Sequence, residues 1–171
     1  MRIDLLFLIL IVFSCSEPVT DLVSDEQGVA SDNLYVGIEE RLIPHFQSFE
    51  AAALERGLEV DLSISGITAN IESIDEDNIA GQCSYGRHRL SPKEIIIDES
   101  FWNQASQLYR EYIVFHELGH CYLLRGHNDN CTEGGIWESL MRSGTVDGCR
   151  DLYNNRTRNN YLDELFIESV L

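Results

Sequence analysis

The sequence contains the stretch His116-Glu117-Leu118-Gly119-His120, in which two histidines and a glutamate have the spacing that a metal site on a helix requires. In a helix, His116 and His120 lie one turn apart on the same face, with about 6 Å between their Cβ atoms, so both imidazoles reach one tetrahedral Zn²⁺. Glu117 is rotated by about 100° from His116, which places its carboxylate beside the metal, where it can take a proton from a zinc-bound water. Unpaired polar groups buried within one turn would each cost about 1 to 3 kcal/mol, and a bound metal removes that cost.

The segment that precedes this motif has the pattern of a helix. Residues 101–115 contain no glycine or proline, and Leu108, Tyr109 and Tyr112 continue to the two histidines at spacings of three and four. We therefore predict a helix over residues 101–124 that carries the metal site.

His127 is the predicted third ligand. In a continuous helix it would lie about 10.5 Å along the axis from His120, too far to share a metal bound at about 2 Å, so the helix must end before it. Gly126 is the expected stop, because a glycine in the left-handed conformation lets the chain fold back. Asp129 and Glu138 are the alternative third ligands.

These residues resemble the metzincin zinc endopeptidases, whose signature is H-E-x-x-H-x-x-G-x-x-H followed by a methionine turn. In this chain Leu123 occupies the glycine position and the third histidine comes one residue late, as if one residue were inserted. The resemblance identifies Met141, within Glu138-Ser139-Leu140-Met141-Arg142-Ser143-Gly144, as the methionine of that turn. Some metzincins place a tyrosine ligand two residues after this methionine, but here Ser143 stands there, so no tyrosine ligand is expected.

The resemblance implies a zinc metalloendopeptidase with one catalytic Zn²⁺ held by His116, His120 and His127. Glu117 would be the catalytic base that activates the zinc-bound water for peptide hydrolysis, then delivers the proton to the leaving amine. The alternative is a cell-surface binding lipoprotein that uses the same fold with structural zinc or none, although such a site would not need Glu117. Peptide deformylase also uses H-E-x-x-H, but its cysteine and glutamine ligand motifs are not found here.

The N-terminal part of the sequence is typical of an exported lipoprotein. Residues 5–13 form an apolar run that is too short to span a bilayer but suits a signal peptide, and the following Ser14-Cys15 resembles a bacterial lipobox. We expect a signal peptide over residues 1–14, lipidation of Cys15, a flexible acidic tether over residues 15–33 and a catalytic domain over residues 34–171. The expected location is the surface of a bacterial membrane, most simply the outer one.

Composition limits the partners. The net charge is −17, with the acidic residues spread along the chain, which argues against nucleic acid and against electrostatic binding to an anionic membrane. A lipid anchor would supply membrane attachment instead. We expect a monomer whose partner is a peptide or protein substrate.

Four cysteines remain once Cys15 is assigned to the lipid, and an even number in an exported protein favours two disulfides. Three pairings are possible. We prefer Cys83 with Cys121, which would tie a strand to the zinc helix, and Cys131 with Cys149, which would staple the segment around Met141.

The remaining pattern predicts an α+β fold: a small, mixed, twisted sheet packed on an N-terminal helix and on the zinc helix, followed by the methionine turn and a C-terminal helix. The expected helices are 34–56, ending at Gly57, 101–124, and one from about 149 or 151 to 168. The expected strands are 58–64, 67–74, 79–85 and 94–98. His45 is expected to be structural. In metzincins the substrate pairs with an edge strand, and residues 81–90, which contain Arg87, His88 and Arg89, could supply that edge.

Overall fold

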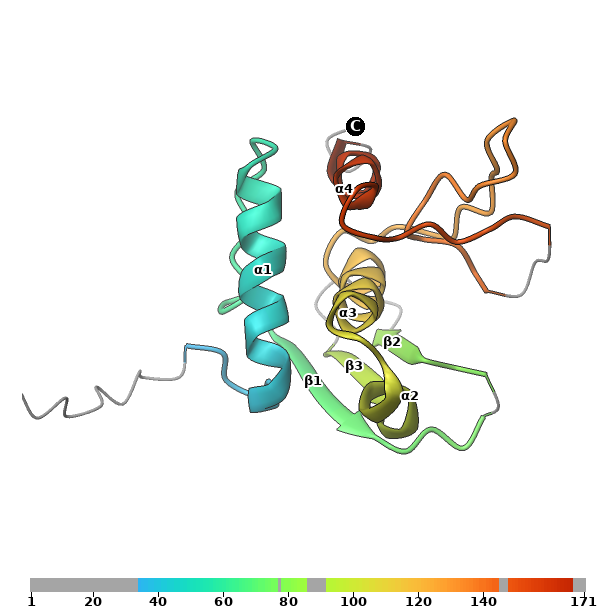
Figure 1. Ribbon diagram of the computed structural model, residues 1–171. Coiled ribbons are helices and arrows are strands. Elements are labelled where there is room, and N and C mark those ends of the chain that lie inside the picture. Colours follow the sequence, from blue (N-terminus) through green and yellow to red (C-terminus); the bar gives the residue numbers. More distant parts are fainter. Residues whose placement is uncertain (1–33, 77, 86–91, 145–147, 168–171) are drawn as a thin grey trace, which may run out of the picture. The chain divides into compact units, whose positions relative to one another are not determined.

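A three-stranded mixed sheet with helices on one face forms the framework of this α+β chain (Figure 1). The computed structural model describes residues 34–76, 78–85, 92–144 and 148–167, all within the unit Asp32–Leu171. The signal peptide, Cys15 and the tether that we predict lie outside the described residues.

The sheet consists of β1 (Ile67–Glu72), β2 (Gly81–Tyr85) and β3 (Lys93–Asp98), in the order β1-β3-β2. β3 pairs in parallel with β1 and antiparallel with β2, which leaves β2 at one edge. Side chains at alternate positions of β1 are buried, as expected for a sheet covered on one face.

The strand expected over residues 58–64 is wrong. The backbone there turns instead, because carboxylate side chains accept hydrogen bonds from its amide groups. Leu62 N–H donates to Glu50 at 2.6 Å and Ser63 N–H donates to Asp61 at 3.0 Å. Side chains that bond nearby backbone groups in this way compete with strand pairing.

The N-terminal helix is shorter than predicted. A 3-10 turn (η1, Glu40–Leu42) leads into α1 (Ile43–Leu54), with Pro44 in its first turn, where a missing N–H costs nothing. Before the turn, Ile38 forms a parallel bridge with Ala69 of the sheet, so that segment is unavailable for a helix. Gly57, at φ +78°, ends the helical region as predicted.

The helix expected over residues 101–124 is two helices, α2 (Glu99–Gln104) and α3 (Gln107–Cys121). The break lies at Ser106, whose hydroxyl accepts a hydrogen bond from Tyr109 N–H and so caps the start of α3. The C-terminal helix, α4 (Arg158–Ile167), begins later than expected because residues 154–157 form a turn, in which Asn154 accepts from Arg156 N–H.

The core lies between the helices and the sheet. α3 contacts β2, β3 and α1. Phe115 of α3 packs edge-on against Phe49 of α1 at 5.1 Å between ring centroids, and Phe49 packs on Phe166 of α4 at 4.9 Å. All three rings are buried. His45, also buried, packs edge-on against Trp102 at 5.4 Å, which agrees with the structural role expected for it.

Two disulfides join the cysteines in the pairing that we predict. Cys83–Cys121 ties β2 to the last residue of α3, and Cys131–Cys149 closes the segment that contains Met141. The first bond therefore fixes the edge strand beside the helix that carries His116 and His120.

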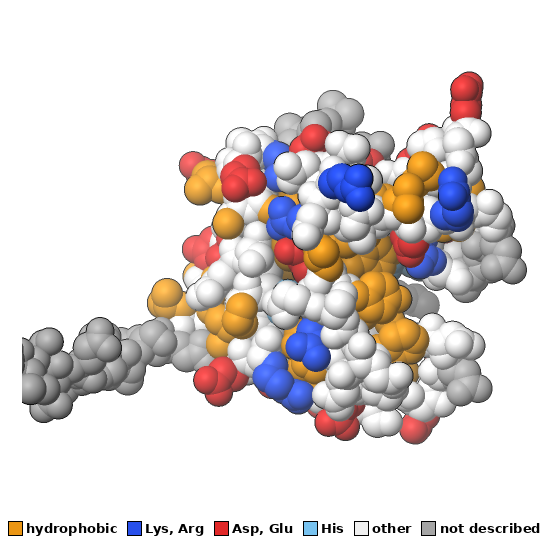
Figure 2. Space-filling model, viewed as in Figure 1, with side chains coloured by type: hydrophobic (Ala, Val, Ile, Leu, Met, Phe, Trp, Pro, Cys, Tyr) orange, Lys and Arg blue, Asp and Glu red, His pale blue; other side chains and the backbone are white. Residues whose placement is uncertain are grey.

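The chain carries a net charge of −17, and the acidic side chains on the face shown in Figure 2 form no single patch. On the face shown in Figure 2, Asp and Glu side chains lie at separate places, interspersed with Lys and Arg. In the part of the chain that the structure describes, no helix combines the length and the apolar character needed to cross a bilayer.

Asp98 is expected to give the fold an acid-sensitive component. Its buried carboxylate caps α2 by accepting from Phe101 N–H at 3.0 Å, and it also accepts from the Ser100 hydroxyl and from Ile74 N–H at 3.0 Å. The Ser100 hydroxyl and these two amides hold the pKa of Asp98 below its usual range. We expect Asp98→Asn to lower the free energy of unfolding at pH 7 by about 1 to 3 kcal/mol.

The sign of the pH dependence follows from the lowered pKa. The carboxylate stabilises the fold above the unfolded-state pKa of about 3.9, and this contribution is lost as pH falls through the lower folded-state value. The difference between the two proteins in urea unfolding should therefore shrink below about pH 4. Asp75→Asn, at an exposed position, is the control; an equal loss in both variants would contradict the role given to Asp98.

Candidate metal centre

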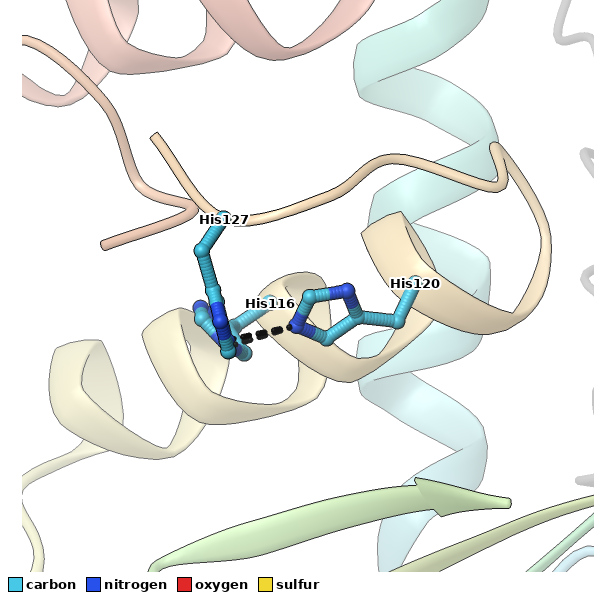
Figure 3. Close-up of side chains that lie close together, drawn as sticks. All are labelled: His116, His120 and His127. Atoms are coloured by element: carbon cyan, nitrogen blue, oxygen red, sulfur yellow. Dashed lines mark hydrogen bonds between the residues drawn. The ribbon is translucent and has the colours of Figure 1, made fainter. Parts of the chain in front are cut away.

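Three histidine side chains converge at one place (Figure 3). His116 and His120 project from α3, and His127 comes from the segment that returns across the end of this helix. The Nε2 atom of His120 lies 3.0 Å from that of His116 and 3.2 Å from that of His127. The candidate ligand atoms of the three residues all lie within 4.8 Å of one another, so this group could hold a metal ion.

The second nitrogen of each helical histidine is engaged by a backbone carbonyl. His116 Nδ1 lies 2.9 Å from Leu140 O, and His120 Nδ1 lies 2.7 Å from Arg125 O. A carbonyl oxygen can only accept a hydrogen bond, so each Nδ1 carries the proton. In a neutral imidazole, Nε2 then carries a lone pair that can bind a metal. Carbonyl acceptors of this kind orient histidines that bind metals.

Two of the three distances between the candidate ligand atoms match those of a tetrahedral metal site. Tetrahedral zinc bound at 2.0 to 2.1 Å separates its nitrogen ligands by about 3.3 Å, close to the two Nε2 distances observed. Neutral imidazoles would turn their Nε2 lone pairs toward one another at this distance, an arrangement that a bound cation would stabilise. Burial lowers the pKa of His116 to about 4 and lowers the pKa of His120 as well, so burial favours the neutral, metal-binding form.

The return of the chain to His127 depends on Leu124 rather than on Gly126. Leu124 adopts φ +58°, whereas Gly126 is not among the residues with positive φ, so the predicted left-handed stop at Gly126 is wrong. The chain has to reverse directly after the helix for His127 to come back. Arg125 N–H closes the turn by donating to Gly119 O at 2.9 Å, and Asn128 N–H then donates to Met141 O at 2.9 Å.

This geometry makes two opposite substitutions informative. A left-handed conformation costs a non-glycine residue about 1 to 2 kcal/mol, so Leu124→Gly should raise the free energy of unfolding by about 0.5 to 1 kcal/mol after the extra entropy of the unfolded chain is subtracted. At Gly126 an added Cβ would meet no atom within 4 Å, so Gly126→Ala should not destabilise the fold. Urea unfolding of both variants tests the assignment, since a left-handed residue at 126 would reverse the two results.

Glu117 is buried, with 4% of its surface exposed, and it faces the first residue of β2. A Cβ at Gly81 would lie 2.7 Å from Glu117 Oε1 and 2.9 Å from its Cγ, so only glycine leaves room for this carboxyl group. Burial raises the pKa of Glu117 to about 8 in the metal-free protein. No role for Gly81 was predicted from the sequence, although an isolated glycine in a strand pattern is a signal for such a close approach.

Met141 is fully buried against Gly119 of α3, in a turn with Leu140. Its Sδ occupies the space that a side chain at Gly119 would need, so the glycine within the predicted motif makes room for the methionine. Glycine costs a helix interior about 1 kcal/mol relative to alanine, which is a sequence signal for such a packing requirement.

The alternative ligands do not join the histidines. Asp129 accepts from Ser143 N–H at 2.7 Å, and this bond holds the pKa of its carboxyl below the usual range. Glu138 is exposed, and neither residue belongs to the group that could hold a metal ion among the described residues. Arg87, His88 and Arg89 lie outside the described residues. β2 is an edge strand as expected, but its described part ends at Tyr85.

No family model, curated protein or solved structure matches this chain.

Proposed function

We propose that this chain is a metzincin-like zinc endopeptidase, in which His116, His120 and His127 hold one zinc ion and Glu117 is the catalytic base. The observation that carries the proposal is the convergence of three Nε2 atoms at one place, together with a buried glutamate in the helical turn that contains two of the histidines. A site that only held a structural ion would have no need of a buried carboxyl group beside its ligands.

Zinc, when bound, would lower the pKa of a water molecule and polarise a peptide carbonyl. The protein supplies the proton transfer. Glu117 accepts the proton that water loses as it attacks the carbonyl carbon, and then donates it to the nitrogen of the departing amine. Gly81 and the buried surroundings hold the carboxyl group in one place for both transfers.

The position of the left-handed residue supports the resemblance to metzincins. In their signature the glycine lies three residues before the third histidine, and here Leu124 lies three residues before His127. The extra residue thus falls between His120 and Leu124, at the end of the helix, and leaves the turn itself with the same spacing. Met141, whose Sδ lies against Gly119 in the helical turn of His120, supports the comparison with the methionine turn of that clan.

The edge strand suggests how a substrate would lie. Among the described residues β2 pairs with β3 along one side and with no strand along the other, and its first residue faces Glu117. An extended peptide added along the outer side of β2 would run past the catalytic base. The substrate that we propose is therefore a peptide or an extended protein segment.

We also propose that the protein is exported and held at a bacterial membrane, on its outer one in the simplest case, by a lipid on Cys15. Two disulfides are typical of oxidising compartments outside the cytosol, which supports export. Growth with a radiolabelled fatty acid should label the chain, and Cys15→Ala should abolish the label.

The decisive experiment is to incubate the chain with a mixed peptide library and identify the products by mass spectrometry. We expect cleavage with one equivalent of zinc, loss of cleavage with a chelator and recovery when zinc is restored. Bound zinc without cleavage of any library peptide would favour the binding lipoprotein instead.

A further inference from the structure

Glu164 of α4 joins the two elements that orient the helical histidines. Its side chain is 16% exposed, and each of its two oxygens accepts a hydrogen bond from a different segment. Oε1 accepts from the guanidinium of Arg125, and Oε2 accepts from the hydroxyl of Ser139 at 2.8 Å. Neither Arg125 nor Ser139 is a candidate metal ligand. Each is connected, however, to a backbone carbonyl that accepts a hydrogen bond from one of the two helical histidines.

The first connection leads to His120. Arg125 is anchored at both ends: its backbone N–H donates to Gly119 O at 2.9 Å, and its guanidinium donates to Glu164 and to the carbonyls of Glu164 and Leu165 at 3.1 and 3.2 Å. The carbonyl of this anchored residue accepts from His120 Nδ1 at 2.7 Å. Glu164 thus helps to fix the direction of the carbonyl that orients His120.

The second connection leads to His116 through one peptide group. Ser139 Oγ accepts from Met141 N–H at 2.9 Å, and the carbonyl of that same peptide unit, Leu140 O, accepts from His116 Nδ1 at 2.9 Å. A trans peptide is planar, with its N–H and C=O pointing in opposite directions, so holding the N–H sets the direction of the C=O.

The Glu164 carboxylate fixes the orientation of the Ser139 hydroxyl by accepting its proton in a hydrogen bond. A hydroxyl has one proton, and donation of that proton to Glu164 leaves the oxygen lone pairs to accept from Met141 N–H. Without Glu164, the hydroxyl can rotate and the peptide group loses its fixed partner. Ser139, Leu140 and Met141 are all fully buried, so water does not readily take over this role.

We propose that Glu164 is a positioning residue that orients both His116 and His120 for zinc, through Arg125 and through the Leu140–Met141 peptide. This inference rests on the proposed metal site. Loss of an outer partner of metal-binding histidines typically weakens metal binding by about 10- to 100-fold, and Glu164 serves two of them.

The test measures the zinc dissociation constant of the full chain by competition with a chromogenic chelator. Glu164→Ala should raise it by about 10- to 100-fold. Glu164→Gln should raise it less, because the amide keeps one acceptor oxygen and the shape of the side chain. Asp163→Ala, on the adjacent residue of α4, removes a partly exposed ion pair with Arg56 and is the matched control, with an expected change within about twofold.

Ser139→Ala separates positioning from general stability. Ser139→Ala removes only the connection to His116. In the double variant with Glu164→Ala, the zinc dissociation constant should rise by less than the product of the two single fold changes, because both substitutions break that same connection. The protons on Nδ1 of His116 and His120 give a second readout in the metal-free protein. We expect both to exchange slowly in the unaltered chain and faster in Glu164→Ala.

The possible failures are distinguishable. If the unaltered chain binds no zinc, both the proposed function and this inference fail. If it binds zinc, and Glu164→Ala or Ser139→Ala binds it equally well while only the thermal stability falls, the positioning role alone is overturned. Should Glu164→Ala not fold, Glu164→Gln and Ser139→Ala carry the same comparison.

Discussion

Glu117→Gln is expected to leave zinc bound and to lower kcat/KM for peptide cleavage by about 10²- to 10⁴-fold, the usual contribution of a positioned general base. Glutamine has nearly the same shape and fits the space beside Gly81, but its amide does not accept a proton at neutral pH. Because Glu117 faces β2 and does not belong to the group of three histidines, zinc affinity should stay unchanged. Steady-state kinetics on one cleaved peptide, together with zinc titration, measures both quantities.

Glu138→Gln is the matched control for this experiment. Glu138 is an exposed glutamate on the segment that carries Met141, and the sequence left it open as a substitute ligand. We expect it to change neither cleavage nor zinc binding. Full activity in Glu117→Gln, or loss of zinc from it, would remove Glu117 from the role of base, whereas loss of zinc from Glu138→Gln would reopen the assignment of His127.

The local part of the site could be predicted, because helix geometry alone places His116, Glu117 and His120. His127 needed one further assumption, that the chain reverses after the helix, and the structure brings this histidine to the other two. The residue that makes the turn was predicted wrongly, since the preference for glycine pointed to Gly126 and the chain uses Leu124. The cost of a left-handed leucine is small compared with the contacts that the turn permits.

The contacts of Arg125, Glu164 and Gly81 that surround the site could not be predicted from the sequence. Arg125 and Glu164 are separated by 39 positions, and nothing in the pattern around either residue indicates the other. Gly81 approaches Glu117 from a strand, a contact that depends on how the sheet packs on α3. Such contacts arise from tertiary packing, which local spacing does not encode.

The spacing of apolar residues predicted most of the helices and strands but not where each one begins and ends. A stretch without glycine or proline at residues 101–115 indicated one helix, yet the Ser106 hydroxyl competes for Tyr109 N–H and starts a new helix there. The alternating segment 58–64 resembled a strand, but its amides bond to the carboxylates of Glu50 and Asp61. In both places a polar side chain overrides the pattern of apolar residues.

The double variant Cys83→Ala/Cys121→Ala is expected to lower the free energy of unfolding by about 4 kcal/mol, because the bond closes a loop of 38 residues whose freedom is restored in the unfolded chain. The effect should also reach the site. Cys121 directly follows His120, and β2, which this bond holds against α3, contains the Gly81 that faces Glu117. Urea unfolding and the rate of peptide cleavage under folding conditions measure the two consequences.

Cys131→Ala/Cys149→Ala separates these two consequences. Its loop of 18 residues gives an expected loss of about 3 kcal/mol by the same relation, so the two variants should be comparably destabilised. The Cys131–Cys149 bond closes the segment around Met141 and does not join β2 to α3, so only loss of Cys83–Cys121 frees the edge strand from the helix that carries Glu117. We therefore expect the folded Cys83→Ala/Cys121→Ala protein to lose more cleavage activity than the other variant at equal zinc occupancy. Equal activity in the two would mean that packing alone, without the disulfide, holds β2 against Glu117.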